Sequence, residues 1–199
     1  DQDIHAPAVY QKAKENLDAF ISRPVLFSES KPCYYIYQLT MNERTQTGLV
    51  CCSSVEDYEN GLIKKHEFTR PEKELDRINH IKTTGAQTGN VFLAFRDIPE
   101  VNEIMSKWKS DKSPVYNFTA EDNIQHTVWV ISDEKIIDRI TEIFREEVPC
   151  TYIADGHHRV ASAAKVKYHL ADNEEAGYFL STLFPAEQLK IMDYNRVVK

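Results

Sequence analysis

Five residues with chemically useful side chains or backbone stand together at the expected junction of a strand and a helix: Asp155, Gly156, His157, His158 and Arg159. The apolar residues 151–154 before them predict a strand, and the Ala-rich residues 160–170 after them predict a helix. A loop in this position lies at a helix N-terminus, where unpaired backbone N–H groups and the helix dipole favour an anion. Residues 155–159 therefore predict a phosphate-binding loop.

The residue types in this loop suit that chemistry. Gly156 permits a positive φ angle and a close approach of a ligand to the backbone. His157 and His158 add donors, and Arg159 can bind a phosphate through two hydrogen bonds. Asp155 can hold Mg²⁺, orient a histidine or act as a base. The alternative is a capping network, with an aspartate at the helix cap, a turn glycine, solvent-facing imidazoles and a structural tie between the arginine and a nearby carboxylate.

A second group of charged residues lies in residues 64–70 and in the helix expected to begin at Pro71. Residues three or four apart on a helix share a face, so Lys73, Arg77 and His80 form one basic stripe. We expect residues 66, 67, 69 and 70 to face the loop of residues 155–159 across one pocket. The candidates for phosphate contacts in this group are His66, Arg70, Lys73 and Arg77, and Glu67 is a candidate base. The alternative is a solvated helix face whose cations are neutralised by neighbouring carboxylates.

Other ligand-binding motifs are weak or missing. His66, Glu67, His157 and His158 could meet around zinc, but adjacent histidines point apart and no pair of ligands stands at positions i and i+4. The chain has neither a Walker A motif nor a G-x-G-x-x-G fingerprint. A P-loop and a Rossmann dinucleotide site are therefore excluded.

The elements that must position these residues alternate along the chain. Strands are predicted at residues 34–39, 49–55, 91–95, 115–118, 126–131, 151–154 and 179–184, and the first two form a hairpin with a long loop over residues 42–48. Helices are predicted at residues 9–21, from Pro71 to near Gly85, at 101–108, from about 136 to near Pro149, and at 160–170, with a polar break at 57–61. This pattern predicts an α+β fold, a mixed sheet flanked by helices.

The composition narrows the class of protein. The formal net charge of −7 argues against a protein that coats nucleic acid, and no apolar run approaches the roughly 18 residues of a membrane span. Cys33, Cys51, Cys52 and Cys150 sit in apolar segments without a C-x-x-C pair, which favours buried free thiols in a reducing cytoplasm. We expect one domain over residues 1–199, excised from a longer polypeptide, because position 1 is not Met and residues 194–199 look like the start of a strand.

Three segments resemble the bacterial and archaeal "domain of unknown function 1015" family: residues 63–70 with Lys73, Asp76 and Arg77, residues 152–159, and residues 193–196. More distantly, residues 155–159 resemble the phosphate-binding loop of the ParB/sulfiredoxin-like superfamily. That resemblance implies a ParB/sulfiredoxin-like core with additions, binding of ATP, ADP or CTP, and phosphate contacts from Gly156, His157, His158 and Arg159. Sulfiredoxins carry a Cys where this loop has a histidine, which disfavours their thiol chemistry.

Three functions remain open. The first is a small-molecule kinase or phosphotransferase using ATP or ADP with Mg²⁺, as in the superfamily's free-serine kinases, with Glu67, Asp155 and His157 as catalytic candidates and Asp155 as the metal ligand. The second is a nucleotide-binding regulatory module of the ParB kind without efficient turnover. The third is a structural domain. The expected partners are a nucleotide and a small-molecule substrate, without nucleic acid or membrane.

Overall fold

A computed structural model describes residues 6–170, 172–193 and 198 of the chain. The helices among these residues are α1 Pro7–Ser22, α2 Val55–Glu59, α3 Pro71–Thr84, α4 Pro99–Asp111, α5 Glu134–Glu147 and α6 His157–His169, with 3-10 turns η1 Glu174–Gly177 and η2 Ala186–Gln188. The strands are β1 Tyr34–Met41, β2 Arg44–Ser54, β3 Ile63–Lys64, β4 Val91–Phe95, β5 Tyr116–Thr119, β6 Gln125–Ile131, β7 Thr151–Asp155 and β8 Tyr178–Pro185.

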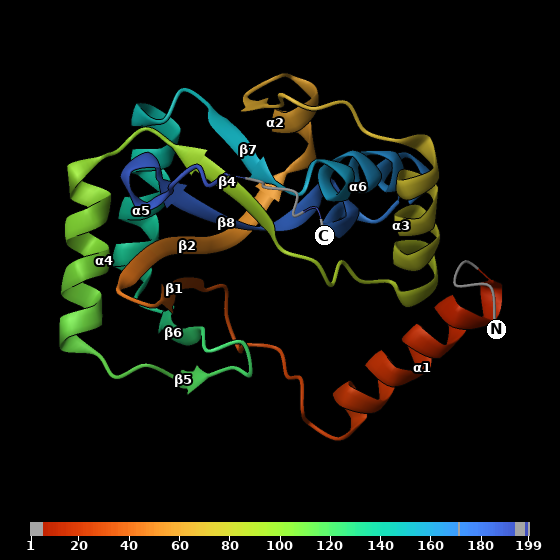
Figure 1. Ribbon diagram of the computed structural model, residues 1–199, viewed down its shortest axis with the longest axis horizontal. Coiled ribbons are helices and arrows are strands. Elements are labelled where there is room, and N and C mark those ends of the chain that lie inside the picture. Colours follow the sequence, from red (N-terminus) through yellow and green to blue (C-terminus); the bar gives the residue numbers. More distant parts are fainter. Residues whose placement is uncertain (1–5, 171, 194–197, 199) are drawn as a thin grey trace.

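The strands form one mixed sheet in the order β3-β7-β4-β8-β2-β1-β6-β5 (Figure 1). β3 is parallel to β7, and β4 is parallel to β8, while the other neighbours are antiparallel. The prediction of an α+β fold with a mixed sheet flanked by helices is confirmed.

The strand β8 joins two parts of this sheet. Its residues 178–183 pair with β2, and its residues 181–185 pair with β4. The strands β3, β7 and β4 lie on one side of it, and β2, β1, β6 and β5 lie on the other.

Helices cover the sheet at both ends. In Figure 1, α4 and α5 lie toward one end of the molecule and α3, α6 and α1 toward the other. From α5, Ile140 and Ile143 reach the core, as their spacing on a helix predicts, and α6 contributes buried Val160, Ala163 and Ala164. The small alanines let the backbone of α6 approach the sheet closely. The start of α6 is therefore held firmly beside the end of β7.

The predicted long hairpin loop is wrong. β1 pairs with β2 from the first residues of β2 onward, with Met41 opposite Arg44 and Thr40 opposite Thr45. The turn is made by Asn42 and Glu43, and Asn42 has a φ of 55°. An asparagine tolerates this left-handed conformation, so a two-residue turn is possible and the polar residues after it continue the strand.

The predicted polar break at residues 57–61 is also wrong in part, because the short helix α2 covers residues 55–59. The hydroxyl of Ser54 accepts hydrogen bonds from the backbone N–H groups of Glu56 and Asp57. This is a helix N-cap, and the two acidic residues that follow it suit the positive end of the helix dipole.

The cysteines are free, as expected. Their predicted burial is wrong for Cys52, which is exposed, and only partly correct for Cys33, Cys51 and Cys150, which are partly exposed. Burial of the Cys51 thiol raises its pKa to about 11.

None of the helices in the described ranges combines the length and apolar character needed to cross a membrane. Of the strand expected at residues 194–199, all but Val198 lie outside the described residues.

Candidate functional site

The junction between β7 and α6 is tighter than the predicted five-residue loop. β7 extends to Asp155, α6 begins at His157, and only Gly156 lies between them. Gly156 has a φ of 103°, a conformation that other residues rarely adopt. Glycine has no side chain to cap the helix, so His157, His158 and Arg159 occupy a first turn whose N–H groups no side chain caps.

Arg159 is packed between two glycines. A β-carbon on Gly89 would lie 2.7 Å from Arg159 Cδ, and one on Gly156 would lie 2.9 Å from Arg159 Nε. One terminal nitrogen of the guanidinium donates to Asp155 Oδ2 at 2.5 Å. The Nε atom is buried and has no hydrogen-bond partner among the residues that the structure describes. The arginine is therefore fixed in place while part of its donor capacity is unused.

The side chain of His157 is buried, only 5% exposed, and lies against residues 66 and 67. Its Nε2 is 3.5 Å from the backbone nitrogen of His66, which donates to it, and its Nδ1 is 3.4 Å from Glu67 Oε2. The rings of His66 and His157 meet edge to face, 4.5 Å apart. Both ring nitrogens thus have neighbours within the protein.

The pKa of His157 is lowered. Burial is the largest cause, because it disfavours the imidazolium, and His66 adds to the effect, whereas Glu67 opposes it. The neutral ring then has its proton on Nδ1, toward the carboxylate, and a lone pair on Nε2 toward the His66 N–H. These contacts give His157 a positioning role, which holds the segment before α3 against α6.

His158 holds the same segment at a second point. Its Nε2 accepts a hydrogen bond from the backbone nitrogen of Arg70 at 3.1 Å. Nearby, Ser162 donates to the carbonyl oxygens of His158 and Glu74, at 2.6 and 3.3 Å. Residues 66, 67 and 70 therefore lie beside the start of α6, as expected, but they contact it directly and do not face it across a pocket.

Glu74 ties α3 to α6. Its carboxylate is almost fully buried, 4% exposed for the whole residue, and accepts hydrogen bonds from Thr69 and Lys165. Burial alone would raise the pKa of Glu74, but the bonds from Lys165 and Thr69 outweigh it, and the pKa is lowered. In the alternative of a solvated helix face, Glu74 neutralises neighbouring cations at the surface, whereas the structure places it inside the contact between the two helices.

A pocket of ≈ 280 Å³ lies beside Arg159, between α1, α3 and the loop that precedes β4. Arg77 and His80 line it together with Arg159, so two members of the predicted basic stripe reach it. Lys73 is exposed and is not among the lining residues. The lining also lacks other predicted residues, namely His66, Glu67, Arg70, Gly156, His157 and His158. The predicted residues therefore form two groups that meet at the first turn of α6.

Several lining residues were missed in the sequence: Tyr10, Gln87, Thr88 and Gly89. Of these, Gln87, Thr88 and Gly89 form the polar link between a helix and a strand, which resembles any other connection. The sequence signal in this link is Gly89 next to Asn90, a pair that is typical of a turn. Tyr10, on α1, donates a hydrogen bond to Asp76 at 2.7 Å.

The predicted metal ligand, Asp155, has an exposed carboxylate with Oδ2 bound to Arg159. Within residues 6–170, 172–193 and 198 there is no group of three or more His, Cys, Asp or Glu side chains able to hold a metal ion. One accessible carboxylate is enough for Mg²⁺ only where other ligands, such as water, complete its coordination.

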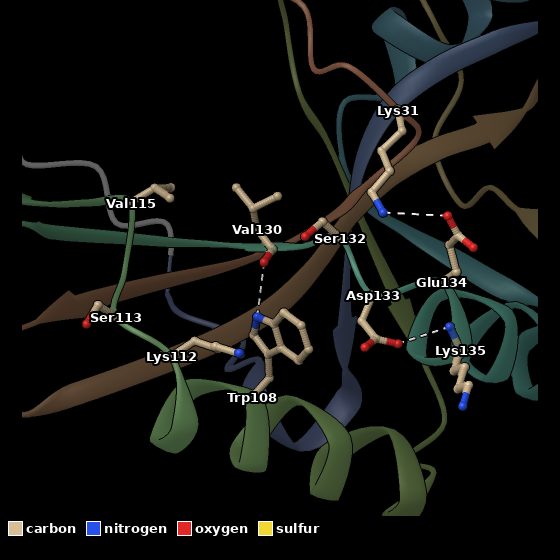
Figure 2. A pocket seen from close by; sticks show the side chains of 10 residues that line it. All are labelled: Lys31, Trp108, Lys112, Ser113, Val115, Val130, Ser132, Asp133, Glu134 and Lys135. Carbon is tan, nitrogen blue, oxygen red and sulfur yellow. Dashed lines mark hydrogen bonds and ion pairs between the residues drawn. The ribbon is translucent and has the colours of Figure 1, made fainter.

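A larger pocket, ≈ 680 Å³, lies beside the start of α5, whose N-terminus differs from that of α6 (Figure 2). Lys31, Lys112 and Lys135 line it, but Lys31 is 3.6 Å from Glu134. Asp133 Oδ1 already accepts hydrogen bonds from the first N–H groups of α5, at 3.0 and 3.2 Å. A carboxylate thus occupies the anion position at α5, whereas the start of α6 has no such cap.

A family model described as "Protein of unknown function (DUF1015)" matches residues 1–199, which include both groups of residues around the start of α6. Searches of curated proteins and of solved structures gave no match.

Proposed function

We propose that this chain, which belongs to the DUF1015 family of proteins of unknown function, binds the phosphates of a nucleotide beside the first turn of α6. One observation carries the proposal: Arg77, His80 and Arg159, from two helices, line the same pocket of ≈ 280 Å³. Two guanidinium groups and an imidazole outnumber the one carboxylate in the lining, Asp76, and so favour an anion with several oxygens. Phosphate accepts paired hydrogen bonds from arginine.

The backbone supports the same ligand. The first turn of α6 has no side-chain cap, and the N-terminus of a helix attracts negative charge. Gly156 and Gly89 hold Arg159 at this turn, so little side-chain entropy is lost when the guanidinium binds. Because the chain as a whole is acidic, the local concentration of cationic groups is a property of the pocket.

The finer proposal is transfer of the terminal phosphoryl group of ATP or ADP to a hydroxyl of a small, amino-acid-like acceptor. The hydroxyl oxygen forms the new P–O bond, the bond to the nucleotide oxygen breaks, and a base takes the hydroxyl proton. Glu67 and Asp155 have exposed carboxylates beside the start of α6 and are the candidates for that base. Mg²⁺, when bound with the nucleotide beside Asp155, neutralises phosphate charge. The distant resemblance to the ParB/sulfiredoxin-like superfamily supports this reaction class.

A second function, a nucleotide-binding regulatory module of the ParB kind without efficient turnover, is favoured by the contacts of His157. Both nitrogens of this buried ring have protein neighbours, which leaves it poorly placed for proton transfer. In this version the nucleotide stabilises one arrangement of residues 66–70 on α6, and a partner recognises that arrangement.

The test has two stages. Thermal denaturation with ATP, ADP, CTP or GTP, each with and without Mg²⁺, is expected to show a concentration-dependent stabilisation by at least one nucleotide. Absence of any shift, together with absence of heat in calorimetric titration, contradicts the proposal. For a nucleotide that binds, product formation on a panel of amino acids and hydroxylated metabolites separates the phosphotransferase from the regulatory module.

A further inference from the structure

A second pocket continues from the phosphate pocket along the same helix. It has a volume of ≈ 410 Å³, and Ile81 and Gln87 line both pockets. α3 forms a continuous wall, since Arg77 and His80 line the first pocket and Ile81, one turn after Arg77, begins the second. The loop after α3 continues the same wall with Gly85 and Ala86.

The chemistry of the two pockets differs. The first contains the cationic groups described above. The second is lined by apolar side chains from α3, α6 and β8, namely Ile81, Val166, Leu170, Phe179 and Leu180, and by the aromatic residue Tyr178. Four polar groups line it as well: Cys52, Gln87, Asn173 and Glu175, whose carboxylate is the one charged group among its lining residues. This is the usual composition of a small-molecule pocket, with apolar walls and a few polar groups that fix orientation.

The junction of the two pockets is already ordered. Gln87 Nε2 donates to the carbonyl oxygen of Tyr178 at 2.8 Å. α3 ends at Thr84 and is followed by Gly85, which has a φ of 69°. The hydroxyl of Thr84 bonds the backbone on both sides, to the carbonyl of His80 at 2.8 Å and that of Ala86 at 3.1 Å. A ligand that spans both pockets would therefore meet a preformed surface.

We infer that the second pocket takes the nucleoside part of the nucleotide whose phosphates lie beside Arg159. A nucleotide has a polyanionic end and a flat, weakly polar base, and the adjoining pockets match these two parts in that order. The base lies against the apolar walls and Tyr178, since base–aromatic stacking is favourable and tolerant of base identity. The inference rests on the proposed phosphate site, but it concerns different residues.

The test compares ADP with pyrophosphate, which has the anionic part alone, by calorimetric titration. The wild-type chain is expected to bind ADP at least about tenfold more tightly than pyrophosphate. Ala176 is half-buried and lines the second pocket, so Ala176→Trp fills that pocket. This variant is expected to bind pyrophosphate as the wild type does and to lose the preference for ADP. Ala120→Trp, at a half-buried alanine in the β5–β6 turn outside both pockets, is the control and is expected to behave as the wild type.

The outcomes separate the two proposals. If the wild type binds pyrophosphate and ADP equally, or if Ala176→Trp keeps the preference for ADP, the nucleoside pocket is wrong and the phosphate site stands. If neither ligand binds, the phosphate site itself is wrong. Should Ala176→Trp fail to melt cooperatively, Tyr178→Ala replaces it, because Tyr178 is 51% exposed and its loss leaves the core intact. An unchanged ratio of ADP to pyrophosphate affinity in Tyr178→Ala then overturns the inference.

Discussion

Arg159 Cδ lies so close to Gly89 that a β-carbon on that glycine would be 2.7 Å away. The two residues are 70 positions apart, on the loop before β4 and on the first turn of α6. Carbon atoms in contact are normally 3.5–4.0 Å apart, so any larger residue at position 89 must displace the arginine. The location of the guanidinium in the pocket thus depends on a residue with no side chain.

Gly89→Ala is therefore expected to reduce nucleotide affinity more than stability. The arginine side chain is flexible and can move aside, so the free energy of unfolding should change by less than about 1 kcal/mol, the lower end of overpacking costs. Nucleotide binding should weaken by about 1.5 kcal/mol, the lower end for a hydrogen bond to a charged group. Calorimetric titration and urea denaturation measure the two quantities. Gly177→Ala is the matched control, because nothing lies within 4 Å of its β-carbon position. Equal effects of both substitutions would contradict the role of Gly89.

Arg159→Ala is expected to weaken nucleotide binding by roughly 1.5–3 kcal/mol, the range for a lost charge-assisted hydrogen bond. Arg159→Lys should recover only part of this loss, because an ammonium lacks the paired donors of a guanidinium. The melting temperature should change little, since the partner carboxylate of Asp155 is 70% exposed and such pairs contribute about 0–1 kcal/mol. A melting temperature lowered by several degrees, with no nucleotide-induced shift in any variant, would instead identify a structural tie.

We expect His157 to make the free energy of unfolding depend on pH. The pKa of this residue in the folded chain lies below its ordinary value of 6.5, first because of burial, so the unfolded chain binds more protons around that value. The contribution to stability is therefore fully present above pH 6.5 and is lost as the pH falls from that value toward the lowered pKa. His157→Gln is expected to make the free energy of unfolding depend less on pH as the pH falls below 6.5. His169→Gln, at an exposed position at the other end of α6, serves as the control and should keep the wild-type slope.

Glu74→Gln is expected to destabilise the chain by about 1–3 kcal/mol at pH 7, the cost of leaving buried polar groups badly paired. The lowered pKa of Glu74 gives the sign of the pH dependence: burial opposes ionisation, but the bonds from Lys165 and Thr69 outweigh it. The ionised carboxylate stabilises the fold above its ordinary pKa of 4.5, and this stabilisation is lost as the pH falls through the lowered value. The difference between wild type and variant should thus narrow below pH 4.5 in urea denaturation. Glu72→Gln, at an exposed carboxylate of α3, should have no comparable effect.

The junction of β7 and α6 could be predicted because its signal is local, although the helix begins three residues earlier than expected. A strand of β-forming residues, a glycine and an Ala-rich helix follow one another directly, and each has its own periodicity or conformational requirement. The approach of residues 66–70 could also be anticipated, because charged groups outside regular elements need partners. The cap at Ser54 was readable in the same way, as a serine before two acidic residues, and was overlooked.

The contact between Gly89 and Arg159 could not be predicted, because it depends on strand order. β4 lies between β7 and β8, which follow it by about sixty and ninety residues in the chain. Hydrophobic periodicity predicts that residues 91–95 form a strand and contains no information about its neighbours. The burial of His157 was hidden for a related reason: only the tertiary contact with residues 66 and 67 removes that ring from water.

The position of β8 has a consequence for synthesis on the ribosome. β2 and β4 do not pair with each other. Each of them pairs with β8, residues 178–185, which is the last strand in chain order among the described residues. A nascent chain that has emerged only as far as α6 can form the strands on either side of that gap but cannot join them. Two incomplete sheets then coexist until β8 emerges and inserts between them, and each has one more unpaired edge than in the finished fold. Because open edges favour pairing with other chains, that interval is the stage at which aggregation of this protein is most favoured.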